Sequence, residues 1–162
     1  MFREVSRNSK QILSAEMCDE ILNKATSGVL GLLGDDDYPY GVPMSFAYDD
    51  GKLYFHCMTR GHKIDAMKKH DKACFTIIET DQIVASEWTT YFRSVIVFGR
   101  TKMIEDVETK KYAHNLLIEK YSPDFKKGAE EDLMSRVDSV GFFELDIEHI
   151  SGKEAIEFAE KR

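Results

Sequence analysis

The chain has 162 residues, of which 43% are hydrophobic and 31% charged, and its formal net charge is −7. This composition is too apolar for an intrinsically disordered chain, and no apolar run approaches the roughly 18 residues that a membrane-spanning helix needs. The acidic balance argues against nucleic acid as a partner, because the most basic stretch, residues 63–72, is interrupted by Asp65 and Asp71. We expect a single domain over residues 1–162, with a charged tail at 153–162.

The first 60 residues predict one helix followed by three extended segments. Ser14 is a typical helix N-cap, and apolar residues follow it at helical spacing. Pro43 lies inside an extended segment. Because proline has no N–H for a sheet ladder, its backbone is expected at an edge, at a bulge or beside a ligand. Asp49-Asp50-Gly51 is a strong hairpin signal. The expected elements are a helix over 15–26 and strands over 29–33, 40–48 and 52–57, the last two being antiparallel.

The remaining residues predict further strands with helices between them. A polar turn that contains a glycine leads into a short helix that turns Ile64 and Met67 inward. Asp106 is placed to cap a helix that Pro123 ends. The expected elements are strands over 74–78, 91–104 and 140–150, a helix over 107–121, a partly ordered loop over 80–90, a weakly helical segment over 125–137, and a tail that forms either a docked short helix or a frayed end.

Six strand-like segments, joined mostly as hairpins, indicate a mainly β fold with peripheral helices, arranged as an antiparallel barrel. No G-x-G-x-x-G sequence follows a strand and no G-x-x-x-x-G-K-[ST] sequence occurs, which disfavours a Rossmann site and a P-loop. The three cysteines lack C-x-x-C spacing, and residues 1–7 lack the apolar stretch of a signal peptide, so we expect a cytoplasmic location. The histidines lack metal-ligand spacing, so no metal site is expected.

The most informative stretch runs from Tyr38 to Lys63. It contains, in order, Pro39-Tyr40-Gly41-Val42-Pro43, the aspartate-glycine hairpin, Tyr54-Phe55-His56 and Gly61-His62-Lys63. This order and spacing resemble the flavin-binding split-barrel superfamily of the pyridoxamine 5′-phosphate oxidases, and within it the nitroimidazole-resistance proteins. The resemblance covers about residues 3–150 and implies an antiparallel six-stranded FMN-binding split β-barrel.

The turn at the end of this stretch fits a phosphate group. A phosphomonoester needs positive charge and backbone N–H donors, and a turn that leads into a helix N-terminus supplies both. Gly61 permits close approach of the backbone, and Lys63 adds a charged donor. The alternative is a solvated turn. The residues expected to hold the phosphate are Thr59, Arg60, Gly61, His62 and Lys63.

The segment around Pro43 fits the flat isoalloxazine ring of a flavin. An irregular strand offers an apolar shelf and backbone groups for the polar edge of the ring, and the family places main chain there; a plain edge strand is the alternative. Tyr54 and Phe55 alternate on the next strand, so they face opposite sides. The residues that the resemblance puts beside the cofactor are Val42, Pro43, Met44, Ser45, Tyr54, Phe55 and His56.

His56 is the candidate catalytic residue, because it matches the histidine that lies near the flavin in the nitroimidazole-resistance proteins. An imidazole could donate to a flavin or substrate oxygen, or relay a proton near neutral pH. The alternative is a hydrogen-bonded structural histidine. Arg93 and Ser94 match a family segment that approaches the cofactor, often across the dimer, although an arginine at a strand margin is also commonly a surface cation.

The resemblance implies a homodimer with FMN at the interface. It also implies an FMN-dependent oxidoreductase that reduces a small acceptor, for example a nitroaromatic such as a 5-nitroimidazole. Oxidation of a vitamin phosphate is disfavoured, because residues 157–162 lack the arginine-rich terminal motif of the true oxidase. Three alternatives stay open: a non-catalytic flavin- or haem-binding module, a protein that uses a deazaflavin, and a barrel that binds no cofactor and serves as an interaction domain.

Overall fold

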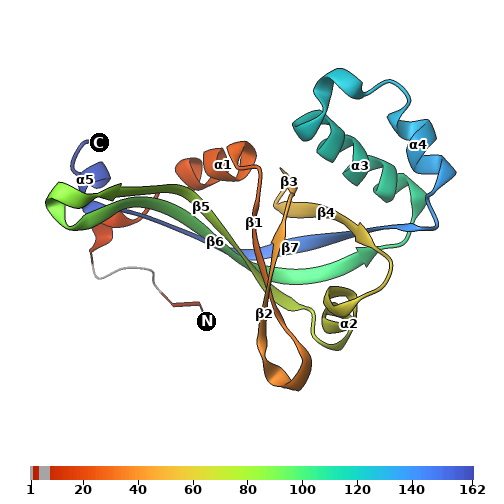
Figure 1. The fold of residues 1–162 in the computed structure, drawn as a ribbon, viewed down its shortest axis with the longest axis horizontal. Coiled ribbons are helices and arrows are strands. Elements are labelled where there is room, and N and C mark those ends of the chain that lie inside the picture. Colours follow the sequence, from red (N-terminus) through yellow and green to blue (C-terminus); the bar gives the residue numbers. More distant parts are fainter. Residues whose placement is uncertain (1, 4–7) are drawn as a thin grey trace.

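The computed structural model describes residues 2–3 and 8–162 (Figure 1). Within these residues, seven strands form one sheet in the order β2-β1-β5-β6-β7-β4-β3, and every pairing is antiparallel. The strands are β1 (Gly28–Leu33), β2 (Pro39–Met44), β3 (Ala47–Asp49), β4 (Lys52–Met58), β5 (Lys72–Val84), β6 (Thr89–Ile104) and β7 (Val140–Glu154). The helices are α1 (Ala15–Lys24), α2 (His62–Lys69), α3 (Val107–Tyr121), α4 (Ala129–Ser135) and α5 (Ile156–Ala159).

The expectation of a mainly antiparallel fold with peripheral helices is confirmed, but the count of six strands is wrong and the sheet is not closed. The segment expected as one strand over 40–48 is broken at Ser45 and Phe46. Its first half pairs with β1 as β2, and its second half pairs with β4 as β3. One continuous segment therefore supplies both edges of the sheet, which adds a strand and leaves the barrel split.

Several local expectations are confirmed. The Ser14 hydroxyl accepts a hydrogen bond from the Met17 N–H at 3.3 Å, and an Asp106 carboxylate oxygen accepts one from the Thr109 N–H at 2.8 Å. Asp50 and Gly51 have positive φ values of 45° and 72°, as a tight two-residue hairpin requires. These features depend on residues close together in the sequence, which explains why pattern alone found them.

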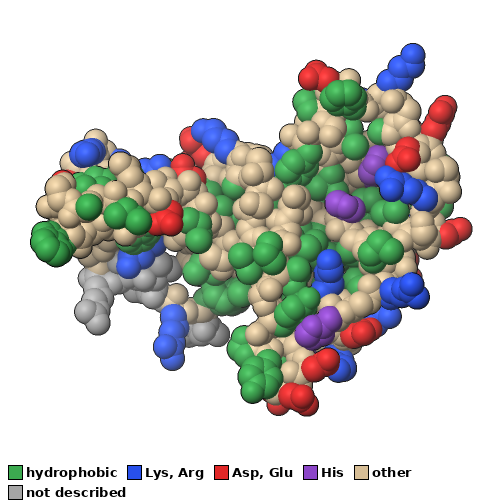
Figure 2. All heavy atoms as spheres, viewed as in Figure 1, with side chains coloured by type: hydrophobic (Ala, Val, Ile, Leu, Met, Phe, Trp, Pro, Cys, Tyr) green, Lys and Arg blue, Asp and Glu red, His purple; other side chains and the backbone are tan. Residues whose placement is uncertain are grey.

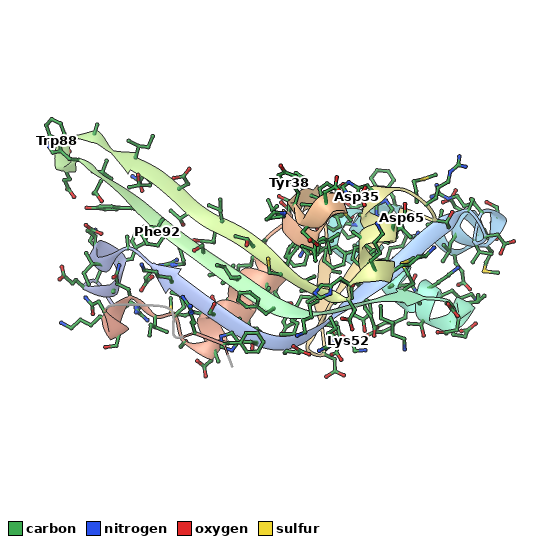
Figure 3. All side chains as sticks on the ribbon, turned by 90° about the horizontal axis from the view of Figure 1, so that it is seen from below. Asp35, Tyr38, Lys52, Asp65, Trp88 and Phe92 are labelled. Carbon is green, nitrogen blue, oxygen red and sulfur yellow. The ribbon has the colours of Figure 1, made fainter. Side chains whose placement is uncertain are left out.

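The expectation of a loop over 80–90 is wrong. Strands β5 and β6 stay paired from Lys72 opposite Arg100 to Val84 opposite Thr89, and they form a long two-stranded arm. The turn between them ends at Trp88, which has a φ of 55° and is 95% exposed at the tip of the arm (Figure 3). This turn lacks the glycine, proline and asparagine residues that mark turns in a sequence, so the pattern did not reveal it.

The charged tail expected over residues 153–162 is ordered rather than frayed. Strand β7 continues to Glu154, which lies opposite Arg93 of β6, and α5 follows directly. The docked short helix, one of the two expected forms of the tail, is the one observed. It lies near the far end of the long arm, away from α2, α3 and α4 (Figure 1).

The core covers both faces of the sheet where β4 and β7 pair. The Phe55 ring stacks on that of Phe143 at 4.6 Å and meets that of Phe75 edge-on at 5.3 Å, in the main cluster. On the opposite face, Tyr54 and Phe142 pack with residues of α3 and α4. None of the helices in the described residues combines the length and the apolar composition of a membrane-spanning segment.

Candidate functional site

Four of the residues expected to bind the cofactor converge where β2, β4 and α2 meet. The Lys63 Nζ atom lies 3.8 Å from the Met44 sulfur. Ser45 and His56 line one cavity of about 410 Å³. His56 also lies close enough to Lys63 for that charge to affect its pKa. The break in the strand at Ser45 therefore opens beside the start of α2.

The first turn of α2 has the properties of an anion site. Gly61 precedes the helix with a φ of 120° and a ψ of 174°, and its carbonyl accepts the N–H groups of Ile64 and Asp65 at 2.9 and 3.1 Å. No side chain caps the helix, so the N–H groups of His62 and Lys63 lack an acceptor within it. Among the described residues Lys63 forms no ion pair. The helix dipole and this ammonium group both favour a negative ligand here.

The backbone at Gly61 is one that other residues rarely adopt, so we expect Gly61→Ala to cost about 1–3 kcal/mol of folding free energy. A Cβ atom there would meet no atom within 4 Å, so the cost is conformational rather than steric. Urea unfolding of the variant measures it. Arg60→Ala, at the exposed neighbouring position, is the control and should stay within about 0.5 kcal/mol of the unmodified protein. If Gly61→Ala and Arg60→Ala were equally stable, the claim that a side chain at position 61 strains the backbone would be contradicted.

Not every residue of the predicted phosphate turn points toward Met44. The His62 ring stacks on Tyr40 at 4.0 Å, and its Nε2 atom accepts the Asp35 N–H at 3.4 Å. The side chain of His62 therefore supports the hairpin of β1 and β2, and what it can offer a ligand is its backbone N–H. Thr59 and Arg60 are exposed beside it.

The other expected cofactor contacts divide by burial. Val42 and Met44 pack against the main core and Pro43 is exposed on β2, an edge strand, which agrees with the first of its three expected settings. Phe55 is fully buried, and Tyr54 lies in the second cluster with its ring edge-on to Tyr112. Within this chain, both aromatic residues pack in the core and hold β4 in place.

His56 is the exposed member of its motif. Partial enclosure of its ring lowers the pKa of His56, and the positive charges of Lys63 and Arg136 lower it further. The imidazole is therefore neutral at neutral pH and can serve as both a donor and an acceptor. It lies at the end of β4, between the first turn of α2 and the cavity.

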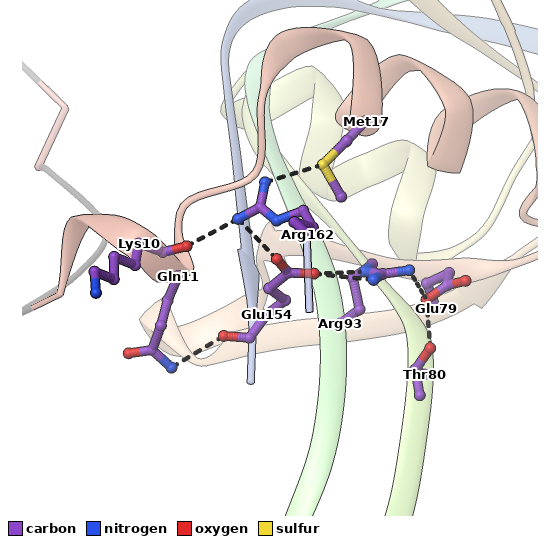
Figure 4. Close-up of polar contacts among 8 residues, drawn as sticks. All are labelled: Lys10, Gln11, Met17, Glu79, Thr80, Arg93, Glu154 and Arg162. Carbon is purple, nitrogen blue, oxygen red and sulfur yellow. Dashed lines mark hydrogen bonds and ion pairs between the residues drawn. The ribbon is translucent and has the colours of Figure 1, made fainter. Parts of the chain in front are cut away.

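Arg93 and Ser94 are not brought to this place within one chain. Arg93 lies on the long arm, where its guanidinium contacts Oε2 of the fully buried Glu154 at 2.9 Å and Glu79 at 3.7 Å (Figure 4). Arg162 approaches the other Glu154 oxygen at 2.8 Å. This cluster joins the arm to the end of the chain, so Arg93 is neither a free surface cation nor a ligand of the Lys63 region in the same chain.

Sequence patterns missed several residues that shape the site. The Tyr121 hydroxyl accepts the Phe46 N–H at 2.9 Å and lies 2.6 Å from the Thr26 carbonyl oxygen, to which it donates. It thereby fixes the break between β2 and β3. His114 and Arg136 line the cavity with His56. Their positions in the sequence carry no signal, because α3 and α4 reach the cavity only after they pack on the sheet.

The side chain of Lys120, next to Tyr121, should make the free energy of unfolding depend on pH. Its Nζ atom lies 4.0 Å from the centre of the Phe46 ring, and burial lowers the pKa of Lys120 to about 8. In the unfolded chain the pKa of Lys120 is near 10.4. Between about pH 8 and this value, the unfolded chain binds more protons at Lys120 than the folded chain does, so the contribution of Lys120 to the free energy of unfolding rises with pH. Urea unfolding at pH 7.5 and 9 measures this rise, which should be absent in the Lys120→Met variant. If the variant kept the pH dependence of the unmodified protein, the lowered pKa of Lys120 would be refuted.

A larger cavity of about 870 Å³ lies elsewhere, beside Lys52, Thr101, Lys102 and Glu144. Tyr54 is the only predicted site residue that lines it, so it is separate from the Lys63 region.

The open antiparallel sheet, whose edges are supplied by one broken segment, defines a split-barrel protein. A family model described as pyridoxamine 5′-phosphate oxidase matches residues 14–154, and the chain belongs to this family. No curated protein sequence matches the chain.

Solved structures show the same fold. A candidate 5-nitroimidazole antibiotic resistance protein from Bacteroides thetaiotaomicron is 23% identical, with a TM-score of 0.72 over 88% of this chain and 86% of that one. An FAD-binding protein from Mesorhizobium loti is 29% identical, with a TM-score of 0.66 over 90% and 97% of the two chains. A flavocytochrome from Azotobacter vinelandii is 22% identical, with a TM-score of 0.77 over 93% and 72%.

Proposed function

We propose that the chain binds FMN and uses it to reduce a small acceptor. The observation that carries the proposal is the uncapped start of α2, with Lys63, directly beside Met44 and the broken edge at Ser45. A phosphate fits the first feature and the edge of a flat ring fits the second. The similar structures support this choice, since they include an FAD-binding protein and a flavocytochrome.

Each residue has a distinct part in this proposal. The backbone N–H groups of His62 and Lys63, with the Lys63 ammonium group, hold the phosphate, while Thr59 and Arg60 border it. The segment from Val42 to Ser45 lies along the ring. A bound flavin supplies the capacity to accept and release electrons. Neutral His56 donates a hydrogen bond to an acceptor oxygen, or passes a proton to it.

The first experiment is an absorption spectrum of the purified protein, with mass spectrometry of whatever acid releases. Flavin bands and the mass of FMN support the proposal, and the mass of FAD or a deazaflavin corrects the cofactor. Reduction by NADH or NADPH and reoxidation by a 5-nitroimidazole then test turnover. A colourless protein that fails to bind added FMN would overturn the proposal.

A non-catalytic flavin- or haem-binding module is the second candidate, and it is favoured by the likeness to proteins that carry both groups. Besides the flavocytochrome, an FAD- and haem-binding protein from Mycobacterium smegmatis is 21% identical, with a TM-score of 0.71 over 91% of this chain and 74% of that one. A Soret band, or a flavin that no nicotinamide donor reduces, would favour this candidate.

We also propose a homodimer, on the evidence of one sheet face. Nine positions on the same side of β1, β5 and β6 carry no charged side chain, although several are exposed. Exposed apolar faces of this kind mark interaction sites. The residues are Val29, Gly31, Leu33, Cys74, Thr76, Ile78, Ser94, Ile96 and Phe98.

Light scattering should give about twice 18.6 kDa for the unmodified protein. Ile78 is 68% exposed within one chain, so Ile78→Asp should fold and yet shift the mass to that of a monomer. Phe125→Asp, at a 78% exposed apolar position outside the sheet, should remain dimeric. A dimeric Ile78→Asp would show that this face is not the interface.

A further inference from the structure

The cavity beside His56 lies between the sheet and the helices α3 and α4. Its volume of about 410 Å³ falls in the range of small-molecule sites. One side is apolar and is formed by Leu117, Ile118, Leu133, Val140 and Phe142. Figure 2 shows histidine side chains beside hydrophobic surface in the region below α3 and α4.

The polar side of the cavity includes a histidine with an unused ring nitrogen. The Nδ1 atom of His114 is buried and has no hydrogen-bond partner among the described residues. Its ring meets Phe142 edge-on, with 6.2 Å between the ring centres. A buried polar atom without a partner is costly, so the ring has hydrogen-bonding capacity that the protein does not satisfy.

Among the residues that line the cavity, Arg136 is the one with a permanently charged side chain. Arg136 lines it and uses one nitrogen in an ion pair with Asp132 at 2.6 Å, which leaves further N–H donors. Burial lowers the pKa of His114, and Arg136 and His56 lower it further, against an opposing effect of Asp132. The residues that line the cavity include no carboxylate. An electron-rich or anionic group is therefore favoured there.

We infer that this cavity is the acceptor pocket, and that it takes a small planar molecule with an apolar body and one group of two electron-rich oxygens, a nitro or carboxylate group. His114 and Arg136 bind that group and determine specificity, and the apolar side holds the body. Ser45 and His56 belong both to this cavity and to the proposed flavin site. The acceptor thus lies beside the ring, and this inference rests on the proposed function.

The test is calorimetric titration of the purified protein with 4-nitrobenzoate, with flavin content read separately from absorbance. His114→Leu and Arg136→Gln should each raise the Kd about tenfold, the loss of one hydrogen bond to a charged or strongly polar group. Neither should change flavin content. His70→Leu is the matched control, because His70 is exposed at the end of α2 and does not line the cavity.

Ile118→Trp offers a second route, since a larger side chain on the cavity wall should abolish binding without removing an interior group. Weaker binding of 4-nitrobenzoate by these variants supports the assignment of the cavity as the acceptor pocket, whether or not flavin is present. No binding of 4-nitrobenzoate by the unmodified protein, or equal Kd values throughout the set, would overturn the inference. If the purified protein held no flavin and the cavity variants still weakened the binding of 4-nitrobenzoate, only the proposed function would be overturned.

Discussion

Replacing Glu154 by alanine is expected to lower the free energy of unfolding by about 3 kcal/mol, the lower end of the range for breaking a buried ion pair. The carboxylate is fully buried, and its two oxygens face Arg93 at 2.9 Å and Arg162 at 2.8 Å (Figure 4). Removing it leaves both guanidinium groups without this partner. The lower end applies because Arg93 and Arg162 are 26% and 38% exposed and can turn toward water.

Urea unfolding measures this loss, and two further variants define its cause. Glu154→Gln keeps the shape and loses the charge, so its effect should be smaller than that of alanine. Glu148→Ala removes an exposed carboxylate that contacts Arg100 at 2.8 Å, and it should cost less than about 1 kcal/mol. A Glu154→Ala variant no less stable than Glu148→Ala would contradict the role given to the buried cluster.

Replacing Lys63 by alanine is expected to weaken FMN binding by roughly 1.5–3 kcal/mol, the contribution of a hydrogen bond to a charged group. The reason is that Lys63 joins the open first turn of α2 while its Nζ atom forms no ion pair among the described residues. Fluorescence titration of flavin-free protein with FMN gives the affinity. FMN should bind most weakly at high ionic strength if the contact is electrostatic.

Two control variants separate charge from packing at this position. Lys63→Met keeps the aliphatic stem near Met44 and should lose as much affinity as alanine, with little change in stability. Lys68→Ala removes an exposed charge later on the same helix and should leave FMN affinity unchanged. If Lys63→Met bound FMN as tightly as the unmodified protein, the phosphate would lie elsewhere.

The sequence alone determined the features that depend on neighbouring residues. The cap residues Ser14 and Asp106 were identified because a capping side chain bonds to an N–H three residues away. The hairpin at Asp50 and Gly51 followed from their tolerance of positive φ. The motifs between Tyr38 and Lys63 also indicated the family, because their order and spacing along the chain are themselves the signal.

Only the tertiary structure decided which of those residues are available to a ligand. Phe55 and His56 are adjacent, yet one is fully buried between aromatic rings and the other opens onto a cavity, because they face opposite sides of the sheet, where the main core covers one side and α3 and α4 cover the other. Arg93 is held by a carboxylate 61 positions away. His114 and Arg136 join His56 only after α3 and α4 pack on the sheet. Burial and pairing between distant segments depend on strand order, which local patterns do not encode.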